Sequence, residues 1–287
     1  MMQTKTPRAE VAQASRALPL PRWLRGSIRF ARRWPLGAAG AAIIVVMILC
    51  AIAAPLVAPY HPLETDFAAQ FSPPTLAHWL GTDAFGRDLL SRLIYGARTA
   101  LLVGFASAFV GATLGALIGV ASAYFGGRID LVIQRVVELF LAFPIIILAL
   151  AVVSILGTGV SNVIMAITVP MIPNCARVVR ASALGVRQMP YVDAARAAGF
   201  GHGRIIFRHM LPNVMAPYLI MLTAYVGQAI LLEASLSFLG LGVAVEFAET
   251  APWLAIFPGL AISLGVFAFN LFGDALRDAL DPKLRVL

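Results

Sequence analysis

Six long apolar stretches dominate this sequence, and they restrict the fold more than any other feature. A transmembrane helix needs about 20 predominantly apolar residues. A bilayer offers the backbone no water, so each crossing segment must satisfy its own hydrogen bonds as a helix. Unbroken apolar runs also differ from the short alternating segments of a β-barrel. We therefore predict an all-α, polytopic membrane protein with six transmembrane helices, at about residues 36–58, 99–125, 138–156, 160–176, 214–232 and 253–272.

Charged residues are scarce and lie mostly between the apolar stretches. They make up 13% of the 287 residues, against about 25% in soluble domains. Connections rich in arginine and lysine alternate with connections that are not, as expected when the basic ones stay in the cytoplasm. Both termini and the connection between the fourth and fifth spans are therefore expected in the cytoplasm. The basic residues of these segments include Arg22, Arg25, Arg29, Arg32, Arg33, Arg177, Arg180, Arg187, Arg196, Arg204 and Arg208.

The same pattern divides the chain into four parts. Residues 1–34 are expected to form a basic cytoplasmic N-terminal segment, and residues 35–98 the first span with an extracytoplasmic segment. Residues 99–273 should form the membrane core, with a cytoplasmic loop at about residues 181–212. Residues 274–287 are expected to be a cytoplasmic tail. The first apolar stretch exceeds the about 7–15 apolar residues of a signal peptide, so it should remain as an anchor.

A row of glycines marks the second expected span. Gly104, Gly111, Gly115 and Gly119 are spaced seven, four and four residues apart. Small residues at this spacing form a smooth helix face that another helix can approach closely. Glycine is also common in membrane helices in general, which is the alternative explanation. We interpret the row as a helix-packing face.

Two acidic residues lie near the ends of expected spans. Glu233 falls at the outer end of the fifth span, where an ionisable group is a candidate for function. We leave two interpretations open for it, a gate or pathway residue and a simply solvated carboxylate. Glu138, at the start of the third span, is interpreted as a solvated helix end.

The sequence lacks several kinds of chemistry. A phosphate-binding loop of the pattern G-x-x-x-x-G-K-[ST] needs a lysine, and the only lysines, Lys5 and Lys283, lie outside any such pattern. The histidines show no metal-binding spacing, and no G-x-S-x-G nucleophile motif occurs. Cys50 and Cys175 lie in apolar runs and are interpreted as small hydrophobic residues. We therefore predict no catalytic residue, no metal site and no nucleic-acid partner.

The stretch "YVDAARAAGFGHGRIIFRHMLPN", residues 191–213, is unusually polar for this chain. Pro190 suits the first turn of a helix, and Gly199 lies where a helix would end in a left-handed turn. Gly201 and Gly203 are expected to permit a second bend. The stretch therefore predicts a short helix on a tight bend, with a low face formed by Ala194, Ala195, Ala197 and Ala198.

This stretch resembles the EAA loop of the membrane subunits of bacterial ABC importers, whose pattern is E-A-A-x-x-x-G followed by I-x-L-P. Here "DAARAAG" lies at residues 193–199 and "IFRHMLP" at residues 206–212, with Asp193 in place of the glutamate. Three further motifs are similar to dipeptide, oligopeptide and nickel permeases of the C-subunit type. They are "LGTDAFGRDLLSRLIYGARTALLVG" at residues 80–104, "EASLSFLGLG" at 233–242 and "NLFGDALRDALDPKLR" at 270–285. The external stretch "VAVEFAET", residues 243–250, is shorter than usual in such permeases.

The resemblance covers the chain from about residue 22 to its end, and it implies a type I ABC importer permease in the bacterial inner membrane. Such a permease pairs with a sister permease as a heterodimer, with two cytoplasmic ATPases and with an extracytoplasmic solute-binding protein. ATP and magnesium would lie on the ATPases, and this chain would hold no cofactor. The short helix would fit a cleft of an ATPase. The residues expected to couple to the ATPase are Tyr191, Asp193, Ala194, Ala195, Ala198, Gly199 and Gly203.

The sequence leaves alternatives open both for the transported solute and for the class of function. Peptides are the commonest cargo that the resemblance implies, and nickel chelates, glutathione and other small solutes stay open. A membrane-embedded scaffold or assembly protein is one alternative function. A proton-driven secondary transporter is another, although it would require acids or histidines in the middle of a span.

Overall fold

The computed structural model describes residues 22–157, 159–241 and 251–280. The chain divides into two units, Met1–Pro35 and Leu36–Leu287. Parts of three expected segments lie outside the described residues: the N-terminal segment up to residue 21, the shortened external stretch at 243–250 and the tail at 281–287. In the first unit, α1 (Arg22–Arg33) is a basic amphipathic helix, a kind of helix that suits the interface of a bilayer.

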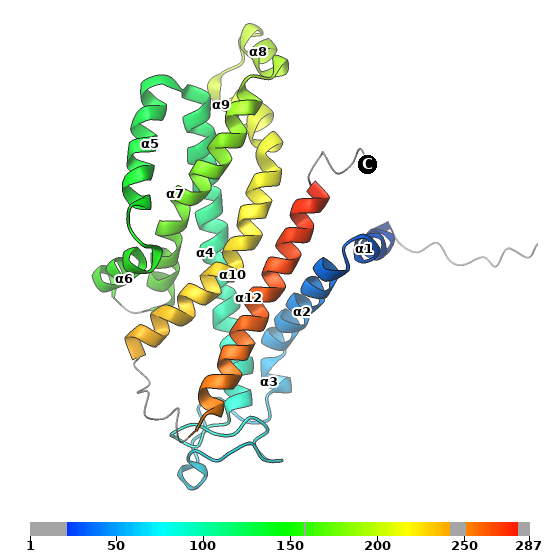
Figure 1. Ribbon diagram of the computed structural model, residues 1–287, viewed down its shortest axis with the longest axis vertical. Helices are drawn as coiled ribbons and strands as arrows, with labels where there is room; N and C mark the ends of the chain where they lie inside the picture. Colours follow the sequence, from blue (N-terminus) through cyan, green and yellow to red (C-terminus); the bar gives the residue numbers. More distant parts are fainter. Residues whose placement is uncertain (1–21, 158, 242–250, 281–287) are drawn as a thin grey trace, which may run out of the picture. The chain divides into compact units, whose positions relative to one another are not determined.

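The second unit is a bundle of long helices (Figure 1). Five stretches of helix are long and apolar enough to cross a bilayer, and the pair α5 and α6 gives a sixth when it is counted as one span. The prediction of an all-α protein with six spans is thus confirmed over the described residues. The long helices are α2 (Pro35–Ile52), α4 (Leu89–Phe125), α5 (Gly127–Leu141), α6 (Ile145–Leu156), α7 (Val160–Arg187), α10 (Met215–Leu241) and α12 (Trp253–Leu280). The short elements are α3 (Ala54–Val57), η1 (Phe67–Ala69), α8 (Pro190–Ala197), α9 (His202–Ile205), η2 (Ile206–Met210) and η3 (Leu211–Val214).

The third span differs from its prediction. It was expected as one helix over residues 138–156, but α5 and α6 are separate helices that meet at a 90° bend. Pro144 lies at the N-terminal end of α6, and a residue that precedes proline is disfavoured in the helical conformation. The interpretation of Glu138 as the start of a span is therefore wrong, because Glu138 lies near the C-terminal end of α5.

Two other spans are longer than predicted. α4 begins at Leu89 instead of residue 99, because the Asp88 carboxylate caps it by accepting a 2.8 Å hydrogen bond from the Ser91 backbone N–H. α7 continues through Pro170 and Pro173 as far as Arg187, well beyond the expected end at residue 176. The second half of α7 contains polar residues, so a hydropathy profile does not predict this extension.

The glycine row of α4 lies at the centre of the helix packing. A Cβ atom on Gly115 would lie 2.6 Å from the Cys175 Cβ atom of α7, and one on Gly119 would lie 2.5 Å from the Ala176 carbonyl oxygen. Gly111 faces α7 in the same way. Gly104 instead faces α10, where an added Cβ atom would lie 2.9 Å from the Ile230 Cγ1 atom. The row therefore packs against two helices, with most of its length against α7.

Hydrogen bonds between helices accompany this close packing. The Tyr225 hydroxyl of α10 donates to the Met171 carbonyl oxygen of α7 over 3.1 Å. The Cys175 thiol, which is fully buried, donates to the Ala112 carbonyl oxygen of α4 over 3.2 Å. These bonds give buried polar groups partners inside the bundle.

The segment between α3 and α4 lies at the end of the bundle opposite α8 (Figure 1). Its backbone is held by side chains: the Asp83 carboxylate accepts from the Phe85 and Arg87 N–H groups over 2.8 and 3.0 Å. The Trp253 indole of α12 donates to the Thr82 carbonyl oxygen over 3.1 Å. The segments that were expected on the extracytoplasmic and cytoplasmic sides of the membrane therefore lie at opposite ends of the second unit.

The close approach of α4 and α7 predicts a difference between two glycine substitutions on α4. Gly119→Ala should lower the melting temperature, because its methyl group would collide with the α7 backbone, and such overpacking costs about 1–3 kcal/mol. Gly96→Ala is the control, since no atom lies within 4 Å of the position of its Cβ atom. It should leave the melting temperature unchanged or raise it. Thermal unfolding of the detergent-purified complex measures both, and equal melting temperatures would contradict the packing role of Gly119.

Candidate functional site

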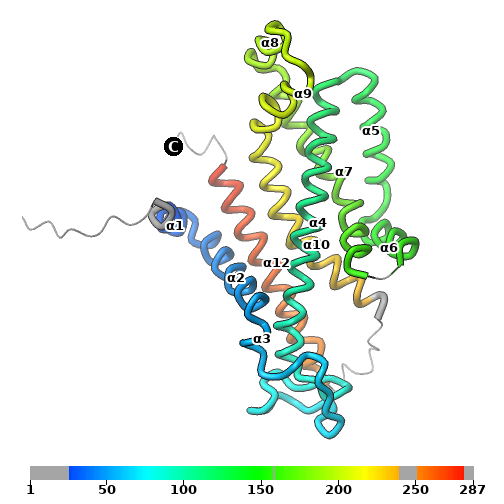
Figure 2. Tube along the Cα trace, turned by 180° about the vertical axis from the view of Figure 1, so that it is seen from behind, coloured from blue at the N-terminus to red at the C-terminus, as the bar shows by residue number. Residues whose placement is uncertain are grey.

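The candidate site is built on α8, the short helix at one end of the second unit (Figure 2). Pro190 occupies its first turn, and the preceding residue, Met189, is extended with ψ 138°. Asp193 lies in the first turn, where a negative charge is favourable to the helix dipole. Its carboxylate accepts a 3.0 Å hydrogen bond from the Arg196 guanidinium, and both side chains are exposed.

Gly199 ends this helix in a left-handed conformation, with φ 73°. The Phe200 N–H donates to the Ala195 carbonyl oxygen over 3.1 Å, and the Gly199 N–H donates to the Arg196 carbonyl oxygen over 2.9 Å. This pattern is a Schellman-type helix end, which favours glycine. The second bend does not need glycine in the same way. Gly201 has φ −65°, and Gly203 lies inside α9 with no left-handed φ, so the expected conformational role of Gly203 is wrong.

α8 is seated on the bundle by one face. Val192 is fully buried and Ala195 is 5% exposed. Both belong to the same buried cluster as Ile205 and Met210. The expected low alanine face is therefore divided: Ala195 faces the chain's own core and cannot offer a surface to a partner. The exposed residues of the helix and its end are Pro190, Tyr191, Asp193, Ala194, Arg196, Ala197, Ala198 and Gly199.

A tyrosine at the end of α4 joins this segment to the bundle. The hydroxyl of Tyr124, a nearly buried residue, lies 2.7 Å from the His202 Nδ1 atom. The Arg196 guanidinium lies 5.4 Å from the centre of the Tyr124 ring, within the range of a cation–π interaction. Neither Tyr124 nor His202 was predicted as a site residue, since residues 78 positions apart carry no signal of contact in a single sequence.

The ends of α4 and α7 are also joined directly. The Arg187 guanidinium donates to the Ala123 carbonyl oxygen over 3.1 Å. A cation at the C-terminus of a helix is favourable to the helix dipole and satisfies a carbonyl that lacks an intrahelical partner. The adjacent Gly126 leaves room for this side chain, because a Cβ atom there would lie 2.6 Å from Arg187 Nη1. The connection that leads into α8 therefore starts from a fixed point on α4.

Glu233 lies away from α8, in the second half of α10. It lines a cavity of about 280 Å³ together with residues of α2, α4 and α12, among them Met47, Arg92 and Pro258. The Ser237 hydroxyl donates to its carboxylate over 3.3 Å. The carboxylate is half-buried between helices of one chain and not fully solvated. A gate or pathway role for Glu233 stays a prediction.

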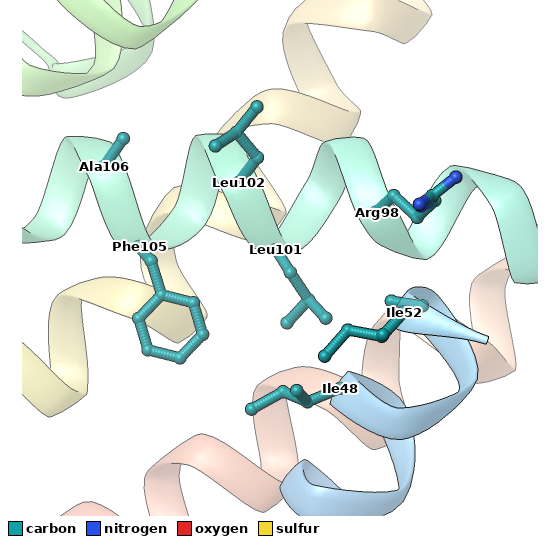
Figure 3. Close-up of a pocket in the computed structure, with 8 residues that line it drawn as sticks. Ile48, Ile52, Arg98, Leu101, Leu102, Phe105 and Ala106 are labelled. Carbon is teal, nitrogen blue, oxygen red and sulfur yellow. The ribbon is translucent and has the colours of Figure 1, made fainter. Parts of the chain in front are cut away.

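A larger groove, of about 600 Å³, runs between α2 and α4. Figure 3 shows Leu101 and Phe105 of α4 pointing toward Ile48 and Ile52 of α2, with Arg98 farther along α4. Apart from Arg98 the labelled side chains are apolar. The walls of this groove are mostly apolar, so they offer no set of polar groups to orient a solute.

Comparisons with known proteins place the chain among transport permeases. Residues 92–286 match the family described as binding-protein-dependent transport system inner membrane component. Residues 23–74 match the N-terminal TM domain of oligopeptide transport permease C.

Individual relatives are similar over most of their length. A protein of Brucella suis biovar 1, provisionally named a peptide transport system permease protein, is 45% identical over 86% of this chain and 88% of its own. The dipeptide transport system permease protein DppC of Alkalihalophilus pseudofirmus is 42% identical, over 86% of this chain and 85% of its own. The glutathione transport system permease protein GsiD of an Escherichia coli strain is 41% identical, over 88% of each chain.

The family match covers more than half of the chain, and these relatives are aligned over 85–88% of their own length. The family works in the inner membrane with ATPase subunits and a solute-binding protein. This chain therefore belongs to the binding-protein-dependent transport system inner membrane components, the multi-pass permease subunits of bacterial ABC importers.

Proposed function

We propose that α8 is the element through which ATPase subunits move this permease, and that the permease forms half of a route for peptides or related small solutes. One observation carries the coupling role of α8. It is a short helix with one face buried in the bundle and the other, small and polar, exposed at the arginine-rich end. Such a helix can enter a cleft of another protein without losing its seat on this one.

The seat of α8 would pass a displacement to two long helices. Val192 and Ala195 press on the buried cluster, His202 bonds to Tyr124 of α4, and Arg187 of α7 bonds to the α4 carboxyl end. α4 and α7 are in backbone contact along the glycine row. A pull on α8 is therefore expected to move α4 and α7 together as one rigid element.

The proposed assembly is a heterodimer of this chain with a homologous sister permease, two ATPases and one binding protein. The match to the N-terminal domain of oligopeptide permease C supports a sister of a different type. For the cargo, the names of the relatives specify peptide, dipeptide and glutathione transport. These solutes share peptide bonds and free charged ends, so we extend that class to this chain. Selectivity should lie largely in the binding protein.

Two adjacent alanines of α8 distinguish its exposed face from its buried face. Ala194→Cys, labelled with a maleimide that carries a photoreactive benzophenone, should cross-link to an ATPase subunit on illumination, because residue 194 is exposed. Ala195→Cys should not, because residue 195 is 5% exposed and faces the core. The assembled transporter, with Cys50 and Cys175 replaced by alanine, is the sample, and gel electrophoresis is the readout. A cross-link from residue 194 to no ATPase would overturn the coupling role.

The left-handed conformation of Gly199 predicts that substitutions there uncouple the transporter. Gly199→Val should reduce solute uptake by about fivefold or more, because a side chain in this conformation costs roughly 1–2 kcal/mol. Insertion in the membrane should persist. Gly199→Asn should retain most uptake, since asparagine tolerates this conformation. Proteoliposome uptake and ATP hydrolysis measure the coupling.

Gly201→Val is the matched control for Gly199→Val. Both positions are exposed and have no atom within 4 Å of the Cβ position, but Gly201 has φ −65°, which any residue adopts. Uptake by Gly201→Val should stay near that of the unmodified protein. Normal uptake by Gly199→Val would show that the bend is dispensable.

The hydrogen bond between Tyr124 and His202 predicts a further coupling defect. Tyr124→Phe should raise the number of ATP molecules hydrolysed per solute by about two- to tenfold, the range that corresponds to a net 0.5–1.5 kcal/mol for one hydrogen bond. Tyr218→Phe is the control, since its hydroxyl also makes one interhelix bond, 3.0 Å to Thr113, but that bond joins α10 to α4 and not to the segment that holds α8. If both variants hydrolyse the same number of ATP molecules per transported solute, Tyr124 acts only through the stability of the fold.

A further inference from the structure

A polar groove of about 580 Å³ lies between α5 and α7, which run side by side in both views of the fold (Figures 1 and 2). On α5 its polar residues recur at intervals of three or four positions, which places them along one face of a helix. The residues that line the groove are Gly127, Asp130, Leu131, Gln134, Arg135, Glu138, Arg177 and Arg180. A charged stripe thus follows α5 for much of its length.

Part of this stripe holds the two helices together. The Arg180 guanidinium of α7 donates to the Asp130 carboxylate of α5 over 2.6 Å, and the Ser122 hydroxyl also donates to that carboxylate. The side chains of Arg180 and Asp130 are only 26% and 17% exposed. This pair therefore acts as a clamp at the floor of the groove.

The rest of the stripe is open. Arg135 and Glu138 form a 2.9 Å ion pair, yet their side chains are 75% and 50% exposed. Arg177 is exposed and lines the same groove, and it has no ion pair or hydrogen bond to the other residues that the structure describes. Three arginines against two acids leave the groove with one net positive charge. Its surplus charge lies on a guanidinium, which binds carboxylates through two parallel hydrogen bonds.

The other face of α5 is apolar and suits lipid or an apolar partner. Val132 and Val136 are 60% and 50% exposed there. A charged stripe turned to lipid would be costly, so in the membrane it must face water or protein. From Gly127 to Glu138 the stripe rises about 16 Å at 1.5 Å per residue. It thus leads from the arginine-rich end of the bundle toward the bend at Pro144.

We propose that this polar groove lines the cytoplasmic part of the solute route, and that Arg177 binds a carboxylate of the passing solute there. The inference rests on the proposed function, in which this chain forms half of that route. A guanidinium in contact with water binds an anion only weakly, because solvent screens the charge. Weak binding is what a route needs, since the solute must leave the groove toward the cytoplasm.

Charge-selective labelling of the assembled transporter in nanodiscs tests this proposal. In a background of Cys50→Ala and Cys175→Ala, Leu131→Cys places a thiol in the groove. Val132→Cys places a matched thiol on the apolar face, since both native side chains are 60% exposed. The probes are two membrane-impermeant methanethiosulfonates, one with a sulfonate and one with a trimethylammonium group. Relative to the thiol at residue 132, the groove thiol should favour the sulfonate over the cation by about tenfold, because positive clefts concentrate anions.

Substitutions of arginine then identify the source of the preference. Arg177→Gln should abolish the preference for the sulfonate probe, and Arg177→Lys should keep part of it. Arg128→Gln should leave it intact, because Arg128 is exposed on α5 but does not line the groove. A preference that survives Arg177→Gln would overturn the role of Arg177.

Two outcomes separate this inference from the coupling role of α8. If the groove thiol is unreactive in the assembled transporter but reactive in the isolated permease, the sister subunit covers the groove and the inference fails. If the ratio of the sulfonate rate to the cation rate is the same at both thiols, the groove is only a solvated surface and the inference also fails. In either case the cross-link from residue 194 to the ATPase still tests the coupling role by itself.

Discussion

The backbone contact between α4 and α7 is the constraint on which the remainder of the bundle depends. Gly115 and Gly119 lack side chains, so the α7 backbone approaches within a distance that no other residue type permits. This contact sets the register of the two helices. The register in turn brings Arg187 to the end of α4 and starts the following connection beside Tyr124. The position of α8 thus follows from packing that lies deep in the bundle.

The same register governs α5. Arg180, which pairs with Asp130 of α5, is itself part of the α4–α7 contact, since a Cβ atom on Gly119 would lie 2.9 Å from the Arg180 backbone N. The clamp attaches α5 near its first turn and leaves the rest of its polar face open toward the groove. The packing of α4 against α7 therefore positions both the proposed ATPase-coupling helix and the proposed solute groove.

The sequence was sufficient for features that depend on local chemistry. It predicted the existence of the spans, the glycine row of α4 and the left-handed end of α8 at Gly199. It failed where tertiary contacts decide. Hydropathy could not register the break at Pro144 or the polar second half of α7, because it averages over a window. A helical pattern also cannot say which alanine of α8 faces the core, and a single sequence cannot pair Tyr124 with His202.

The surface that α8 turns outward combines small and large side chains. Ala194, Ala197 and Ala198 contribute methyl groups, and Tyr191 and the ion pair of Asp193 with Arg196 are exposed beside them. The methyl groups permit close approach of another protein but give little specificity, since many clefts would accept them. Under the proposed coupling role, discrimination between one ATPase and its paralogues is therefore expected from the residues around these methyl groups, including Arg204 and Arg208, which are exposed at the margin of the helix. Under this proposal, exchanging those flanking residues, and not the helix itself, would match a permease of this kind to a different ATPase.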